Sequence, residues 1–199
     1  GRASSFFHPE TGEEVDSGQH VFMRCCSYYL GFLQKLGITD KVYIQPRLEV
    51  KVFDPKGKNS RVGSITSASL PAPFHLLPSL LTYPHISFGA RLRVIFAALL
   101  ILFVRRSQRE DLKESTFYSW LKEHGQREEE IARLWNLIVL PTLNEDVYRA
   151  SADWGIMVFQ EALLKKAHNA DIGYSRVGLS ELVSEGAISY IKSRGGKVI

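Results

Sequence analysis

Cysteine is scarce in this sequence of 199 residues: there are two, and they are adjacent, Cys25 and Cys26. Adjacent cysteines rarely close a disulfide, because neighbouring residues do not easily reach the geometry that the bond requires. A zinc site would need further Cys or His ligands, and none are spaced to supply them. We therefore expect two free thiols, a reducing compartment and no metal site.

The sequence also lacks the short motifs of common catalytic and nucleotide-binding sites. It contains no G-x-S-x-G, no H-E-x-x-H, no P-loop and no G-x-G-x-x-G. Base-reading motifs are missing too, and a net charge of +4 is too small to indicate a nucleic-acid partner without a clustered patch. The residues alone therefore indicate no nucleophile–base pair and no nucleic-acid interface.

Long apolar runs are missing as well, apart from one of intermediate length. Residues 94–104 (VIFAALLILFV) carry no charge, and Arg91, Arg93, Arg105 and Arg106 bracket them. A membrane span needs about 18 to 20 such residues, so this run is too short to cross a bilayer. It is either a buried core helix or an interfacial helix whose arginines contact lipid phosphates. The bracketing arginines and the basic net charge favour the interface.

The composition is that of an ordinary globular protein, with 45% apolar and 23% charged residues. Alternation of apolar and charged residues over Leu48–Phe53 predicts a half-buried strand. Turn residues at 54–58 predict that the chain then pairs back as a hairpin. The remaining strand signals lie at 42–44 and 61–65, a further hairpin signal lies within 1–20, and 68–90 has the proline content of a loop with short helical turns.

Five stretches have the periodicity of amphipathic helices. The first is predicted at Val21–Leu36, with Gly37 as its stop. Pro141 is expected to limit another, and the acidic run 128–130 is most simply a solvated helix start. The other helices are predicted at 116–124, 126–139, 150–166 and 180–194. Together these elements predict an α+β fold with a small antiparallel sheet and several helices.

Several segments, taken in order, resemble the superfamily of FAD-dependent amine oxidases and phytoene desaturases. Residues 1–3 (GRA) are similar to the end of the Gly-Gly-Arg motif that follows the first βαβ unit of those proteins. Residues 16–21 (DSGQHV) resemble a D-x-G-x-H stretch of the squalene and phytoene desaturase branch, and 116–126 (TFYSWLKEHGQ) resembles its S-F-x-x-W-L-x-x-x-G helix. The resemblance continues at 134–136, 142–145, 150–152, 177–182 and 194–196, and is closest to the squalene-associated FAD-dependent desaturases, the hydroxysqualene dehydroxylases.

This resemblance implies a substrate-domain fragment of a Rossmann-like flavoprotein, with both ends cut from a longer chain. Residues 1–20 would be a residual piece of the FAD-binding domain, and 191–199 the start of a strand returning to it. Residues 21–190 would form the substrate domain, with a helical, membrane-contacting insert at 72–110. The FAD-binding remainder of the chain would be its partner, and we expect this stretch alone to bind FAD poorly or not at all.

The resemblance also implies cofactor-binding residues. Arg2, next to Gly1, would lie against the FAD ribose and pyrophosphate, where a guanidinium pairs with phosphate. Gly18, Gln19 and His20 would lie near the isoalloxazine ring. His20 is also a candidate proton donor, because loss of a hydroxyl group as water needs an acid near the departing oxygen.

On the substrate side, Phe22, Trp135 and Asn144 are the candidate contacts, although a tryptophan at helical spacing is also typical of a core. The implied reaction is reduction of hydroxysqualene to squalene, at the cytoplasmic face of the inner membrane. The alternatives are desaturation of phytoene or zeta-carotene, oxidation of amines, and a non-catalytic module that binds lipid or a membrane surface.

Overall fold

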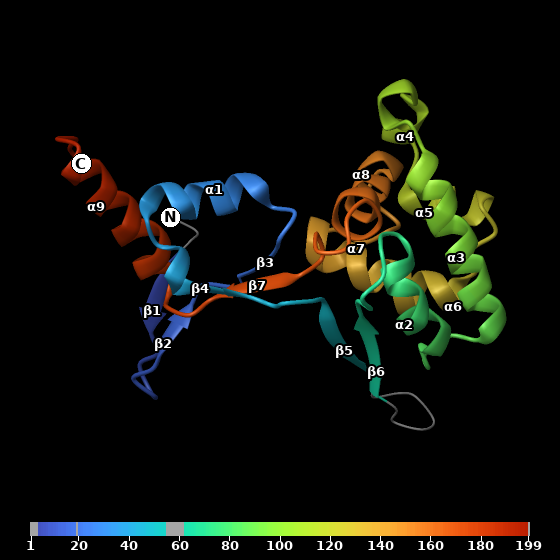
Figure 1. Ribbon diagram of the computed structural model, residues 1–199, viewed down its shortest axis with the longest axis horizontal. Helices are drawn as coiled ribbons and strands as arrows, with labels where there is room; N and C mark the ends of the chain where they lie inside the picture. Colours follow the sequence, from blue (N-terminus) through green and yellow to red (C-terminus); the bar gives the residue numbers. More distant parts are fainter. Residues whose placement is uncertain (1–3, 19, 55–61, 199) are drawn as a thin grey trace. The chain divides into compact units, whose positions relative to one another are not determined.

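The computed structural model describes residues 4–18, 20–54 and 62–198, and the chain divides into two compact units (Figure 1). Unit 1 consists of Gly1–Pro46 and Asp171–Ile199, and unit 2 of Arg47–Ala170. These borders differ from the expected domain borders at residues 20 and 190. The cofactor and substrate roles given to those segments stay predictions.

Unit 1 is built on a three-stranded antiparallel sheet whose central strand comes from the far end of the chain (Figure 1). β7 (Ile172–Ser175) lies between β3 (Val21–Met23) and β4 (Val42–Ile44). Phe22 pairs with Gly173 across β3 and β7. Pairing over such a sequence distance leaves no local signal, which explains why β7 was not predicted.

The first helix begins later than its periodicity suggests. α1 spans Ser27–Leu36, because the preceding residues of the predicted helix are taken up by β3 and by a turn at Cys25 and Cys26. Its predicted stop is confirmed: Gly37 adopts φ 73°, a left-handed conformation that glycine tolerates best.

The rest of unit 1 packs around α1 and the hairpin of the first residues. The hairpin signal within 1–20 is confirmed by the antiparallel strands β1 and β2. Buried Leu33, Ile38 and Leu182 form the core of the unit. The remaining elements are β1 (Ser5–Phe7), β2 (Glu14–Asp16), the 3-10 turn η1 (Thr39–Lys41), the π-helical turn η6 (Ser180–Glu185) and α9 (Gly186–Ser193), after which 194–198 have no regular structure.

Unit 2 is a hairpin followed by a set of helices (Figure 1). β5 (Glu49–Phe53) and β6 (Val62–Thr66) pair antiparallel, as the turn residues between them predict. The helical elements are η2 (Phe74–Leu76), α2 (Leu77–Thr82), α3 (Phe88–Phe103), η3 (Arg106–Gln108), α4 (Asp111–Glu114), α5 (Phe117–Glu123), α6 (Glu128–Glu130), η4 (Ile131–Trp135), α7 (Asn136–Leu143), α8 (Ala152–Val158) and η5 (Phe159–Leu164), of which η4 and η5 are π-helical. The mixed α+β character with small antiparallel sheets is thus confirmed.

The aromatic ring of Phe117 lies at the centre of the unit 2 core. It stacks on Trp120 with ring centroids 6.1 Å apart, and meets Trp135 edge to face at 6.0 Å. On its other side it contacts Gly155 of α8, where a Cβ atom would come within 2.3 Å of the ring. Only glycine permits this approach of the α8 backbone.

One prediction about the central helices is wrong and a second is wrong in part, because α6 begins at Glu128 as expected and Glu128 and Glu129 are exposed. Pro141 lies inside α7, which continues to Leu143, so it does not end the helix. Glu130 is not solvated: its side chain is fully buried and accepts two hydrogen bonds from Arg93, at 2.6 and 3.0 Å. Arg93 lies 37 residues before Glu130 in the sequence, and helical periodicity does not detect a contact between such distant residues.

The apolar run 94–104 lies largely in α3. One face of this helix is buried through Ala90, Val94, Ala97 and Ile101. Within the described ranges, no helix has both the length and the apolar character needed to cross a membrane.

Candidate apolar site

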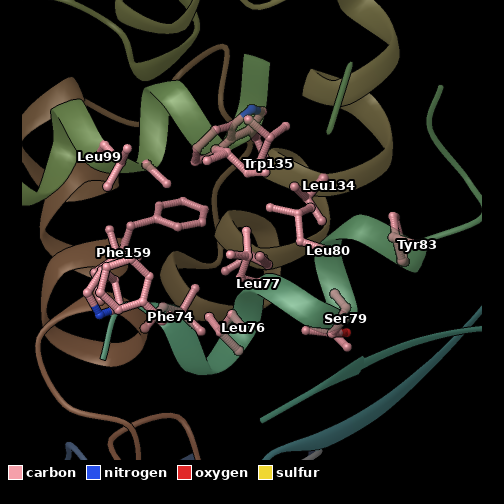
Figure 2. Close-up of a pocket in the computed structure, with 18 residues that line it drawn as sticks. Phe74, Leu76, Leu77, Ser79, Leu80, Tyr83, Leu99, Leu134, Trp135 and Phe159 are labelled. Atoms are coloured by element: carbon pink, nitrogen blue, oxygen red, sulfur yellow. The ribbon is translucent and has the colours of Figure 1, made fainter. Parts of the chain in front are cut away.

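A cavity of about 150 Å³ lies among the helices of unit 2 (Figure 2). Its walls come from η2, α2, α3, η4, α7 and η5, with Ile65 of β6. Figure 2 shows Leu77, Leu80, Leu99, Trp135 and Phe159 around the same space. None of the described residues that line it is charged.

Three of the lining residues carry a polar side-chain atom, and each atom is already hydrogen-bonded to the protein. The Ser79 hydroxyl donates to the Ser64 carbonyl at 2.8 Å and accepts from the Thr66 amide at 3.0 Å. The Tyr83 hydroxyl donates to the carbonyl of Arg133 at 3.1 Å. The third is the indole N–H of Trp135, which donates to the Gln126 side chain at 2.9 Å. The cavity therefore offers an occupant apolar contacts and no unsatisfied polar side chain.

The raised pKa of the Tyr83 hydroxyl reflects an apolar environment beside the cavity. Burial raises the pKa of Tyr83 to about 12, outweighing the opposing effect of nearby Arg133. Its phenol stays protonated throughout the physiological pH range and keeps its hydrogen bond to the backbone. A neutral, hydrogen-bonded phenol places no charge beside the cavity.

The π-helical turns η4 and η5 supply much of the cavity wall. Leu134 and Trp135 come from η4, and Phe159, Leu163 and Leu164 come from η5. A π-helical turn carries an extra residue, so it rotates the following side chains relative to a regular helix. Such bulges are frequent at functional sites. Sequence periodicity assumes a regular helix, so it does not detect them.

Of the predicted substrate residues, Trp135 and Asn144 belong to unit 2 and Phe22 belongs to unit 1. Trp135 lines the cavity and is 1% exposed. Asn144 does not line it: it is exposed and adopts φ 54° at the end of α7, where it serves as the helix stop. Phe22 belongs to unit 1, where its ring covers Gly173 and meets Tyr29 edge to face at 5.0 Å.

The residues predicted near a cofactor are described in part. His20 is half-buried, and its Nε2 atom is buried without a hydrogen-bond partner among the described residues. Gly18, exposed, lies beside it, and a Cβ atom there would be 3.8 Å from that same Nε2. Gly1, Arg2 and Gln19 lie outside the described residues.

The two thiols lie in the turn between β3 and α1, and neither forms a disulfide, as expected. Cys26 is exposed and occupies the N-terminal cap position of α1. A hydrogen bond from the Cys25 side chain and one from the backbone of Met23 lower the pKa of Cys26 to about 6, against the opposing effect of partial burial. No group of three metal-ligating side chains occurs in the described part of the chain.

Comparison with known proteins identifies the family. The model of the flavin containing amine oxidoreductases matches residues 1–196. The chain belongs to this family. A crystal structure of a RAB GDI from Plasmodium falciparum has a similar fold, with a TM-score of 0.52 and 15% identity. The match covers 96% of this chain and 47% of that protein, so the chain spans about half its length. None of the curated proteins matches the chain.

Membership of the flavin containing amine oxidoreductases implies a flavin, and His20 fits such a group. A buried polar atom without a partner is costly, and most such atoms in folded proteins are hydrogen-bonded. The Nε2 atom of His20 is therefore suited to a polar atom of a bound ligand. The exposed backbone at Gly18 leaves room for a flat ring to approach.

Proposed function

We propose that the whole protein is an FAD-dependent oxidoreductase that reduces hydroxysqualene to squalene. The family supports flavin chemistry, and the cavity in unit 2 supports an apolar substrate. An apolar chain that enters a cavity without unsatisfied polar groups gains about 0.8 kcal/mol per buried CH₂ and leaves no hydrogen bond unmade. That match between cavity and substrate is the observation that carries the proposal.

On the cofactor side, Gly1, Arg2, Gly18, Gln19 and His20 would hold the FAD. When bound, FAD supplies the two-electron chemistry of the reaction. His20 would orient it through Nε2 or hold the proton that the departing hydroxyl group takes up. Because the described structure leaves Nε2 without a partner, the atom is available for either role.

On the substrate side, Trp135 would contact the hydrocarbon directly, since its ring forms part of the cavity wall and its N–H is engaged elsewhere. Phe22 and Asn144 are proposed as further contacts. The helix-stop conformation of Asn144 already accounts for that residue without a ligand.

The alternatives within the flavin class differ in how well they suit the cavity. Phytoene or zeta-carotene suits it as well as squalene does, because those chains are equally apolar. An amine substrate suits it poorly. A protonated amine among neutral side chains would lack the counter-charge that its burial requires.

We further propose that α3 contacts the surface of the inner membrane from the cytoplasmic side. Phe88, Leu92, Phe96, Leu99 and Phe103 are all exposed, by 41 to 77%, and their spacing places them in one stripe along the helix. A stripe of this kind suits insertion of an in-plane helix into the head-group region. Unit 2 also carries the whole net positive charge of the chain.

Three of the four arginines that bracket the apolar run contribute less to this surface than the sequence suggests. Arg93 pairs with buried Glu130, and Arg106 pairs bidentately with Asp153 at 2.8 and 2.9 Å. Arg91 donates to the backbone carbonyls of Leu81 and Ile86.

Lipid binding should therefore depend on the apolar stripe of α3 more than on the presence of anionic lipid. Phe96→Glu in the whole protein should abolish binding to phosphatidylcholine vesicles, and unchanged binding would contradict the proposal.

The reaction itself is tested by offering the FAD-loaded whole protein hydroxysqualene, phytoene and a set of amines in separate assays. Formation of squalene from hydroxysqualene is the expected result. Desaturated carotenoid or oxidised amine as the product would replace the proposal with one of the alternatives. Binding of lipid with turnover of none of them would favour a non-catalytic lipid-binding module.

A further inference from the structure

The size of the unit 2 cavity limits how much of a long hydrocarbon it holds. Its volume is about 150 Å³. A cavity of about that size lined by Leu, Ile and Phe is known to stay dry and to bind benzene, a molecule of six carbons. One isoprene unit has five carbons, so the cavity has room for about one such unit. A chain of six units cannot be enclosed in it.

The walls of the cavity differ in exposure from one part to another. Phe74 and Leu99 line it and are 55% and 41% exposed, so they form an open apolar rim. Tyr83, Val94 and Trp135 line it and are at most 3% exposed, so this part of the wall is closed. Figure 2 shows Phe74 and Leu99 on one side and Tyr83 on the other. A cavity open at one side and closed at the other receives the end of a chain more readily than its middle.

From these two observations we infer that the cavity is a subsite for one terminal prenyl unit of the substrate. The inference rests on the proposed isoprenoid substrate and adds which part of it the cavity binds. The remaining units extend past the rim at Phe74 and Leu99. Leu99 also belongs to the exposed stripe of α3, so the same apolar surface continues from the rim along the helix. Recognition of the chain end determines which part of the substrate lies in unit 2.

The first test uses 2-methyl-2-butene, a free five-carbon hydrocarbon, as a probe of the FAD-loaded whole protein. Binding is followed by NMR through the indole N–H signal of Trp135. We expect saturable binding that Ala98→Phe weakens about tenfold or more, because the new ring occupies the cavity. Leu140→Phe, on an exposed position of α7 that does not line the cavity, is the matched control and should leave binding unchanged.

Ile138→Ala provides a second variant for the case that Ala98→Phe does not fold. This change enlarges the cavity by removing side-chain carbons from its wall. It should shift the preference from the five-carbon probe toward a larger branched hydrocarbon. Equal preference in the variant and the unaltered protein would overturn the inference, as would absence of probe binding to the unaltered protein.

The second test separates chain ends from chain middles. Two squalene analogues are compared, one with a bulky cap on one end and one with bulky caps on both ends. The singly capped analogue should bind nearly as well as squalene, and the doubly capped analogue at least about tenfold more weakly. Equal binding of the two analogues would show that the end is not recognised. Because both tests measure binding, they remain informative if the dehydroxylation assay fails, and that assay remains informative if they fail.

Discussion

The indole N–H of Trp135 donates to the side-chain oxygen of Gln126 at 2.9 Å, and both side chains are buried. The Gln126 amide nitrogen in turn donates to the backbone carbonyls of Arg93 and His124, at 3.0 and 3.3 Å. The glutamine thus satisfies three groups from different parts of unit 2. It also keeps the polar edge of the Trp135 ring out of the apolar cavity that the same ring lines.

Replacing Gln126 with leucine should destabilise the protein by about 1–3 kcal/mol, since it leaves the Trp135 N–H buried and unsatisfied. Urea unfolding followed by tryptophan fluorescence measures the change. Gln108→Leu is the matched control, because Gln108 is exposed in η3, and its effect should stay within about 0.5 kcal/mol. Equal effects of the two substitutions would contradict the structural role given to Gln126.

The Arg93–Glu130 pair should contribute far more to the free energy of unfolding than the ion pairs at the surface. Arg93→Ala leaves the fully buried carboxylate of Glu130 without its partner, so we expect a loss of about 3–5 kcal/mol in the free energy of unfolding. Arg109 pairs with exposed Asp111, and Arg109→Ala should cost at most about 1 kcal/mol. A large loss from Arg109→Ala with none from Arg93→Ala would reverse this ranking.

The same pair predicts a dependence of stability on pH. Burial tends to raise the pKa of Glu130, but hydrogen bonds from Arg93 and from the Arg127 backbone outweigh it and lower the pKa below its usual value. The ionised pair therefore stabilises the fold at neutral pH and is lost as pH falls through the lowered pKa. The gap in stability between the unaltered protein and Arg93→Ala should shrink on acidification. A difference in stability that grew on acidification would contradict this prediction.

Close packing of Phe117 on α8 predicts that Gly155 is not replaceable by alanine. The added methyl group would meet the ring of Phe117, a fully buried residue, and should cost about 1–3 kcal/mol through overpacking. Gly89→Ala in α3 is the control, since its added Cβ would meet only Arg93 at an ordinary 3.5 Å. Alanine there should be neutral or stabilise by up to about 1 kcal/mol. Thermal unfolding of both variants distinguishes the two expectations.

Cys26 should be reactive at a pH where ordinary thiols are largely protonated. With a pKa of about 6, its alkylation by iodoacetamide should reach half its maximal rate near pH 6. Cys25→Ala removes the thiol that donates to Cys26, so the midpoint should move toward the ordinary thiol range. Mass spectrometry of the labelled peptide follows each site. A midpoint that is the same in both proteins would show that Cys25 does not stabilise the thiolate.

The sequence predicts those parts of the fold that local chemistry determines. The alternation in Leu48–Phe53 correctly predicts β5, and Gly37 correctly marks the end of α1. The central strand β7 and the strand at Val21–Met23 were missed, because each forms through pairing with a segment far away in the chain. Tertiary pairing overrides the helical periodicity that extends into β3.

The candidate site was predictable only in part, for related reasons. Trp135 was named, but its position on a cavity wall depends on the π-helical turn η4 and on the other elements that line the cavity, such as α3. Arg93 and Arg106 look free for lipid in the sequence, and the carboxylates that bind them come from distant segments. Among the described residues the Nε2 atom of His20 has no hydrogen-bond partner, and this is recognised only once its burial is known.

Reduction of hydroxysqualene tests the central proposal most directly. The whole protein, loaded with FAD and reduced without oxygen, is mixed with hydroxysqualene while the flavin absorbance and the organic products are followed together. We expect reoxidation of the flavin with formation of an equal amount of squalene. A flavin that stays reduced, with hydroxysqualene recovered unchanged, would contradict the proposal.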